Sequence, residues 1–193
     1  MDSVNKKILG LCALFFLLPG CSACNRSNTQ NVSLPDTKIV MESYNPQFSR
    51  TMQYLDMLVM KGSSSIEEVK PYLSNKDPKQ RWVAVYIIGR VANHDQVNIL
   101  LPLLQDSEEA VRISAAGTLA NKGYREALPV LISGTRSTGT ISYLHPEQEI
   151  AGFCFDVLSV YTKQTFFTPE EWEQWWKIVE GKLSWDEATK TYR

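Results

Sequence analysis

The sequence has few of the residues that most catalytic and metal sites require. It contains two histidines, and neither is spaced with Cys, Asp or Glu in the way that metal ligands are. It also has no G-x-S-x-G, Walker or G-x-G-x-x-G motif. Paired carboxylates fall in predicted first turns of helices, where they complement the helix dipole: Glu67-Glu68, Glu108-Glu109 and Glu170-Glu171. We therefore expect no catalytic residue, no metal and no cofactor.

An excess of charge of one sign is also missing. The 20 basic and 21 acidic residues give a net charge of −1, so no basic surface predicts binding to nucleic acid. Cysteine is scarce, with Cys12, Cys21, Cys24 and Cys154. These four do not form the pattern of a disulfide framework. Cys154 lies in an apolar stretch, where we expect it to be a small core residue.

No apolar run is long enough to span a membrane. The longest, from Ile8 to Leu18, has 11 residues, whereas a spanning helix needs about 20. It follows Lys6 and Lys7, as the apolar part of a signal peptide does. The next residues, Leu18-Pro19-Gly20-Cys21, resemble a bacterial lipobox, which implies that Cys21 is lipidated with chains such as palmitate. The alternative is an ordinary secretory signal that is cleaved near Ala23.

These features divide the chain into three parts. We expect a lipoprotein signal peptide over 1–20, a flexible tether over 21–45 and a folded domain over 46–193. The stretch after Cys21 is rich in Asn, Ser, Thr and Gln and cannot bury enough apolar surface to offset its conformational entropy. The third part has the length of one domain.

The domain repeats itself at a spacing of 31 residues. Pairs at this spacing include Pro71 with Pro102, Leu73 with Leu104, Arg81 with Arg112, and Ala84 with Ala115. A fixed period in this range is typical of stacked repeat proteins, whose single unit cannot bury its apolar face alone. The period-3.6 pattern of apolar residues indicates helices throughout, and no long period-2 alternation indicates a strand.

The repeated residues resemble HEAT-like repeats of the phycobilisome-lyase type, whose first helix reads roughly D-x-x-x-V-R-x-x-A-A-x-x-L-G. The matching positions are Asp106, Val111, Arg112, Ala115 and Leu119, and one unit earlier Arg81, Ala84, Ile88 and Gly89. The resemblance implies an all-α fold, a short right-handed α-solenoid of four helix pairs. We expect these pairs at about 46–74, 77–105, 107–134 and 147–180.

Four repeat positions have predicted structural roles. Ala84 and Ala115 are small enough to allow close contact between neighbouring helices. We expect Arg81 and Arg112 to play equivalent roles, each binding an acidic or carbonyl group of an adjoining turn, with Asp77 and Asp106 as the nearest candidates. The alternative is an arginine ladder that binds an anion.

Helix starts and the C-terminal region add further predictions. Capping boxes are expected at Ser64 with Glu67 and at Thr168 with Glu171, and Asp95 is expected to cap another helix. Tryptophans form one stripe after Thr168, which we interpret as a cap over the end of the stack; the alternative is an aromatic ligand cage. Trp185 is expected to open a last short helix.

A long segment interrupts the period. It runs over 133–148, is rich in Gly, Ser and Thr, and is longer than the other turns. Long loops on rigid scaffolds often carry function, so Arg136, Tyr143 and His145 are candidate partner-binding residues. A tolerated insertion without function is the alternative.

Together these patterns favour a non-catalytic scaffold. The first hypothesis is a membrane-tethered HEAT-repeat protein that binds a protein partner at the bacterial cell envelope. In this family the second helix of each pair normally lines the binding face. Other hypotheses are a lyase-like or enzyme-accessory factor that binds a small ligand in the groove, and a purely structural envelope lipoprotein. Ser22 after the lipobox indicates the outer membrane, facing the periplasm, if the host is Gram-negative.

The lipobox leads to a direct test. Changing Cys21 to Ala should release the protein from membranes or leave an uncleaved precursor, because no residue remains to accept the lipid. Membrane fractionation and intact-mass measurement detect either result. An unchanged mass and membrane partition would contradict lipidation.

Overall fold

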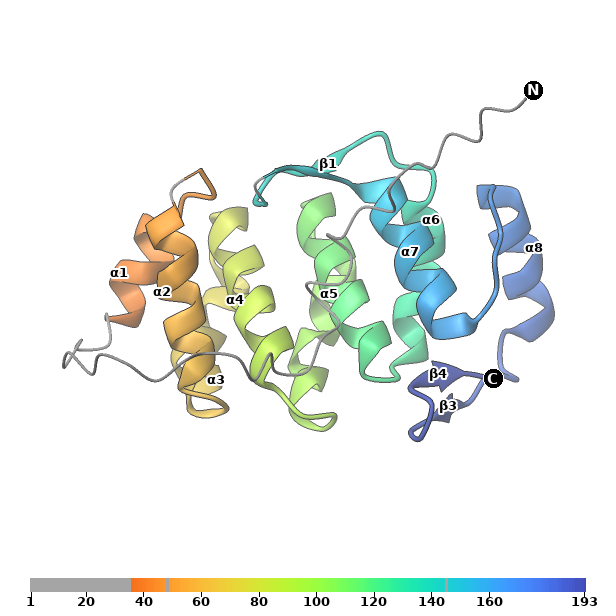
Figure 1. Ribbon diagram of the computed structural model, residues 1–193, viewed down its shortest axis with the longest axis horizontal. Helices are drawn as coiled ribbons and strands as arrows, with labels where there is room; N and C mark the ends of the chain where they lie inside the picture. Colours follow the sequence, from red (N-terminus) through yellow and green to blue (C-terminus); the bar gives the residue numbers. More distant parts are fainter. Residues whose placement is uncertain (1–35, 48, 145) are drawn as a thin grey trace, which may run out of the picture.

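The fold is an all-α solenoid, in which helices stand side by side in one row (Figure 1). The computed structural model describes residues 36–47, 49–144 and 146–193. The predicted signal peptide, Cys21 and the candidate residue His145 lie outside the described residues.

The elements follow one another in a regular order. They are α1 (Thr37–Ser43), α2 (Ser49–Met60), α3 (Ser64–Val69), η2 (Lys70–Ser74), α4 (Pro78–Val91), η3 (Gln96–Gln105), α5 (Glu109–Asn121), η4 (Arg125–Ala127), α6 (Leu128–Gly134), β1 (Thr140–Ile141), β2 (Gln148–Glu149), α7 (Ile150–Thr162), α8 (Pro169–Val179), β3 (Trp185–Asp186) and β4 (Thr191–Tyr192).

Four helix pairs make up the row, at about the positions that the sequence predicts. The first helices α2, α4, α5 and α7 contact one another in sequence. The second elements are α3 with η2, then η3, then η4 with α6, and finally α8. Two of them contain 3₁₀ turns beside Pro71 and Pro102. Proline has no N–H for the helix ladder and clashes with the preceding turn, so the repeated proline explains why these elements are not continuous α-helices.

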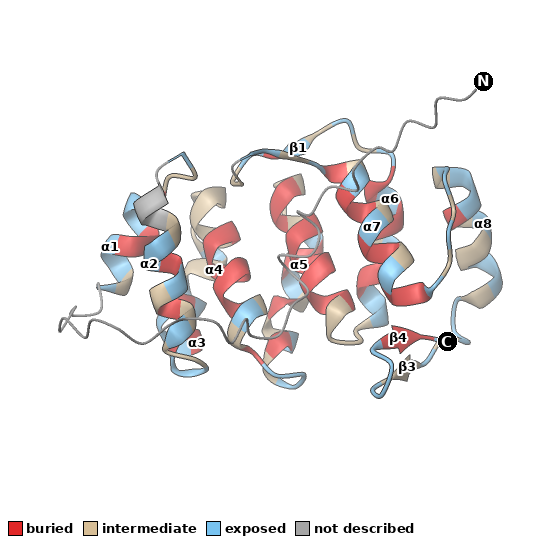
Figure 2. Cartoon of the chain, viewed as in Figure 1, coloured by how far each residue is buried: buried red, intermediate tan, exposed pale blue. Residues whose placement is uncertain are grey.

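Helix α5 lies at the centre of the stack and is buried on most of its surface (Figure 2). Ten of its 13 residues are buried because it packs against α4 on one side and against α6 and α7 on the other. Small residues make this possible. A Cβ atom on Gly117 would lie 2.6 Å from the ring of Phe153, and Ala84 and Ala115 are fully buried.

The N-terminal boundary of the folded domain differs from the prediction. Within the expected tether over 21–45, α1 packs against α2 and α4, with Val40, Met41 and Tyr44 almost fully buried. Asp36 caps this helix by accepting a hydrogen bond from the N–H of Lys38. The domain therefore includes residues from 36 onward, since α1 covers the apolar end of the stack.

The C-terminus also differs from the prediction. Trp185 does not open a helix but begins a hairpin of β3 and β4. A Cβ atom on Gly123 would lie 2.5 Å from the Trp185 ring, and the Tyr192 hydroxyl donates to the carbonyl of Ala120 over 3.2 Å. The hairpin thus packs against the end of α5, a contact between distant parts of the chain that the local pattern does not reveal.

Of the predicted capping boxes, the one at Thr168 and Glu171 is confirmed, with both reciprocal hydrogen bonds present. The Ser64 box is wrong, because Ser64 donates to the carbonyl of Lys61 instead. Asp95 makes no side-chain cap. In its place Asn93 and Gln96 each accept a hydrogen bond from the other's backbone N–H, at 2.9 and 3.1 Å.

The close packing around α5 predicts the effect of a larger side chain. Ala115→Leu should lower the free energy of unfolding by about 1 to 3 kcal/mol, because the added atoms must displace a neighbouring helix. Urea denaturation measures this loss. The matched control is Ala188→Leu at an exposed position. Equal stability of the two variants would contradict the close contact.

Candidate functional site

Three turns at the starts of successive units each contain a hydrogen bond of the same type. Asn75, Asp106 and Ser137 lie 31 residues apart. Each side-chain oxygen accepts a bond from the backbone N–H two residues later, at 2.9, 2.8 and 3.0 Å. Such side-chain turns are typical of Asn, Asp and Ser. The register of the repeat therefore continues through Ser137, although the segment after it departs from the period.

The two repeated arginines bind equivalent carbonyls. Arg81 donates through Nη1 to the carbonyls of Asn75 and Lys76, at 2.9 and 3.2 Å. Arg112 donates through Nη1 to the carbonyls of Asp106 and Ser107, at 2.6 and 3.2 Å. The two arginines therefore make the same pair of carbonyl bonds, which hold their guanidinium groups in matching positions.

The remaining nitrogens of the two arginines differ in their partners. Nε and Nη2 of Arg81 donate to the two carboxylate oxygens of Asp106, at 2.7 and 2.6 Å. This pair joins the second unit to the third, and its side chains are only 11% and 4% exposed. The hydrogen bonds to Asp106 raise the pKa of Arg81 further above its usual value.

For Arg112 the corresponding turn residue is Ser137 rather than a carboxylate. The Ser137 hydroxyl donates to Oε2 of Glu109 over 3.0 Å, and not to Arg112. Within the ranges that the structure describes, Nε and Nη2 of Arg112 have no hydrogen-bond partner. A guanidinium group without a carboxylate partner is unusual this close to a packed core, because the two-nitrogen fork of arginine usually binds carboxylates through two parallel bonds.

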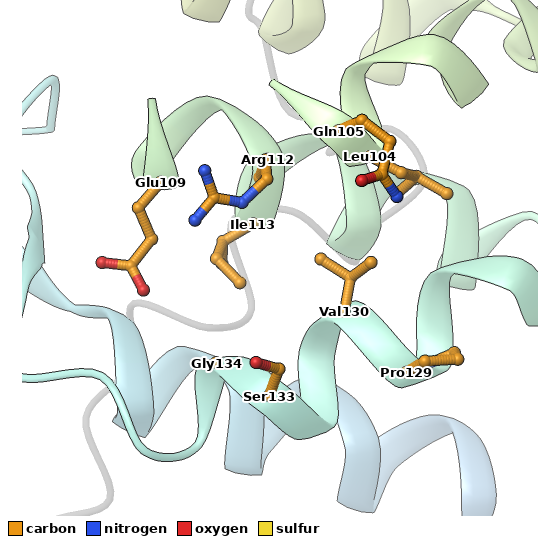
Figure 3. Close-up of a pocket in the computed structure, with 9 residues that line it drawn as sticks. All are labelled: Leu104, Gln105, Glu109, Arg112, Ile113, Pro129, Val130, Ser133 and Gly134. Carbon is orange, nitrogen blue, oxygen red and sulfur yellow. The ribbon is translucent and has the colours of Figure 1, made fainter. Parts of the chain in front are cut away.

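Arg112 lies in a pocket of about 250 Å³ between the second and third units. In Figure 3, Arg112 and Glu109 lie on one wall, and Val130 and Ser133 lie on the facing helix. The lining residues are Leu104, Gln105, Glu109, Arg112, Ile113, Pro129, Val130, Ser133 and Gly134. The pocket thus combines apolar walls with one cation, and it opens among the second elements η3 and α6.

Comparison with known proteins supports the same architecture. Residues 66–140 match the family model of HEAT repeats. This part of the solenoid therefore consists of HEAT-like repeats. No curated protein and no solved structure matches the chain. The matched range contains both arginines and the whole of the pocket lining.

The structure does not bring Arg136 and Tyr143, two of the predicted partner-binding residues, together. Arg136 forms ion pairs of 2.8 Å with Glu170 and with Glu173 of α8. Tyr143 lies at the other end of the segment, with its ring 5.8 Å from that of Trp82. Its carbonyl accepts a 2.7 Å hydrogen bond from the hydroxyl of Tyr44.

The segment that carries these residues is a strap along one edge of the stack. Its β1 strand pairs with β2, and the chain around β1 extends from the α7 end toward α4 (Figure 1). Its two anchors, Arg136 and Tyr143, give it a structural role in joining the last unit to the first two. This contact was not predicted, because Tyr44 lies 99 residues from Tyr143 in the sequence.

The tryptophan stripe lies at the far end of the solenoid. Trp172 is fully buried, and its ring meets those of Phe166 and Trp175 edge to face, at 4.9 and 5.6 Å. Helix α8 packs against α6 and so covers the open end of the stack. This arrangement supports the interpretation as a terminal cap.

The described residues show no group of three or more His, Cys, Asp or Glu side chains that could hold a metal ion. Burial raises the pKa of the Cys154 thiol, which therefore stays protonated and is a poor nucleophile. In the part of the chain that the structure describes, no helix is both long and apolar enough to cross a membrane.

The sequence analysis did not identify the pocket around Arg112. Its apolar lining is ordinary for a repeat core, and Gln105 and Ser133 carry no motif. A comparison of equivalent repeat positions could have identified it, because the position of Asp106 in one unit is occupied by Ser137 in the next.

The different partners of the two arginines predict unequal effects of the same substitution. Arg81→Gln should lower the free energy of unfolding by about 2 to 4 kcal/mol, because it leaves the buried Asp106 carboxylate without its counter-charge. Arg112→Gln removes hydrogen bonds to two carbonyls and should cost about 1 kcal/mol. Urea denaturation of both variants compares them directly. Equal losses would show that the carboxylate adds nothing to the contact between units.

Proposed function

We propose that this chain is a lipid-anchored HEAT-repeat scaffold at the bacterial cell envelope. It binds a protein partner on the face formed by its second elements. The observation that carries the proposal is that the face of the second elements remains uncovered. Both ends of the solenoid are covered, by α1 and by α8, and one edge is covered by the strap. The pocket between η3 and α6 opens on the face of the second elements.

The family match supports this function. HEAT repeats commonly mediate protein interactions, and a stack of this kind presents one extended surface. Fold alone does not confer an activity, and the described residues include no group of three or more His, Cys, Asp or Glu side chains that could hold a metal ion. Binding rather than catalysis is therefore the function that these residues support best.

The lipid anchor is the part of the proposal that depends on sequence. A lipidated Cys21 lies before α1 in the chain, so the α1 end of the solenoid is the one nearest the attachment point along the sequence. Attachment at one end leaves the long side of the solenoid accessible. An outer-membrane location facing the periplasm follows from Ser22 if the host is Gram-negative.

A small-ligand function is the alternative, and the pocket favours it in part. Its apolar walls and single cation are features of ligand sites. Its volume of about 250 Å³ is, however, below the roughly 300 to 1,000 Å³ that is usual for such sites. A pigment or a similarly large ligand would not fit, whereas one side chain of a larger partner would.

Photo-crosslinking in native membranes tests where a partner binds. A photoreactive amino acid is placed at Gln105 or Pro129, which are exposed on the second elements, and at Gln53 or Asp156, which are exposed on α2 and α7. We expect one protein to crosslink from the first two positions and not from the two controls. Equal crosslinking from both sets, or none from Gln105 and Pro129, would contradict the proposed face.

A further inference from the structure

We propose that the Arg112 pocket binds the carboxylate of an Asp or Glu side chain of the protein partner. This carboxylate would occupy the position at Arg112 that Asp106 occupies at Arg81. The inference rests on the proposed function, since it assigns the chemistry of the partner group at the same face.

The second unit serves as an internal template. There, Nε and Nη2 of Arg81 bind both oxygens of one carboxylate, at 2.7 and 2.6 Å. This planar, bidentate geometry is the one that a guanidinium fork recognises best. The third unit holds Arg112 by the same two carbonyl bonds, so its fork is pre-oriented in the same way.

The third unit has no carboxylate at the position that corresponds to Asp106. Ser137 forms the same turn hydrogen bond as Asp106, but its hydroxyl is bonded to Glu109 and carries no charge. Nε and Nη2 of Arg112 have no hydrogen-bond partner among the described residues. Neither nitrogen is among the buried side-chain atoms that lack a hydrogen-bond partner, so solvent reaches both and an incoming carboxylate can approach them.

The walls of the pocket favour one carboxylate on an aliphatic stem. Leu104, Ile113 and Val130 provide apolar contact for methylene groups, and Ser133 provides a hydroxyl. Arg112 is the only cation among the lining residues, and Glu109 adds a negative charge. A phosphate dianion would be repelled by Glu109 more strongly than a carboxylate with a single charge.

A titration tests the chemistry of the site. The full chain, ¹⁵N-labelled and held in detergent micelles, is titrated with N-acetyl-aspartate N-methylamide. The side-chain N–H resonance of Nε in Arg112 should shift and saturate, while that of Arg81 should not. The asparagine analogue of the probe should cause no shift. Absence of a saturable shift at Arg112 would overturn the inference.

Variants separate binding from folding. Arg112→Gln should weaken probe binding at least tenfold, while the matched control Arg125→Gln, at an exposed arginine, should leave it unchanged. Glu109→Gln should strengthen binding several-fold by removing repulsion. If Arg112→Gln binds the probe as the parent chain does, the fork is not the site.

Ser137→Asp provides a second test that leaves Arg112 in place. It supplies a carboxylate at the register position of Asp106. This carboxylate should pair with the Arg112 fork and prevent probe binding. Ser137→Asn, with the same shape and no charge, should retain probe binding. Unchanged probe binding by Ser137→Asp would overturn the internal template.

The last arm identifies the source of the carboxylate. With a photoreactive residue at Pro129, the crosslinked partner segment is mapped by mass spectrometry. We expect an Asp or Glu in that segment whose change to Asn or Gln reduces crosslinking at least tenfold, as Arg112→Gln and Ser137→Asp do. If these changes abolish probe binding but not crosslinking, the site takes a free small carboxylate. That result would overturn the inference and leave the scaffold function intact. If no variant crosslinks, both the function and the inference fail.

Discussion

The solenoid depends on the close approach of α5 to the helices on either side. Glycines mark the points of contact. A Cβ atom would lie 3.0 Å from Thr118 if added to Gly89, 2.6 Å from Phe153 if added to Gly117, and 2.6 Å from Ile113 if added to Gly134. Because interiors are close-packed, a larger side chain at any of these points would move a whole helix. The spacing between units, and with it the distance over which Arg81 reaches Asp106, follows from these contacts.

The arginine series shows how such a stack couples its units. Stability in a solenoid is approximately a sum of unit terms and nearest-neighbour contacts, and the pair of Arg81 with Asp106 is one such contact. At the next junction the hydrogen bond between Ser137 and Glu109 does not replace it. The strap supplies another connection there, through Arg136 to α8 and through Tyr143 to Trp82. The segment that departs from the repeat pattern at Ser137 is therefore the same one that forms the long-range contacts of the strap.

The sequence predicted the features that repeat and missed those that depend on distant contacts. The 31-residue period located the second and third helix pairs and placed Ala84 with Ala115, and Arg81 with Arg112, at equivalent positions. Helix α1 was missed because its apolar positions, Val40, Met41 and Tyr44, are too few to stand out from a polar stretch. The hairpin at Trp185 forms on the surface of α5, so local capping preferences gave the wrong element. The pocket could have been predicted, since comparing Ser137 with Asp106 requires only the register.

The rigidity of the site bears on how it would recognise a partner. Arg112 is held by two carbonyl bonds of a turn that Asp106 closes with its own side chain, and that side chain is in turn fixed by Arg81. The fork therefore has little rotamer freedom left to lose on binding. Preorganisation of this kind lowers the entropic cost of association, so even a small pocket can contribute to affinity. Because Arg81 fixes the Asp106 side chain that closes this turn, the ion pair of Arg81 with Asp106 also helps to orient the guanidinium group of Arg112.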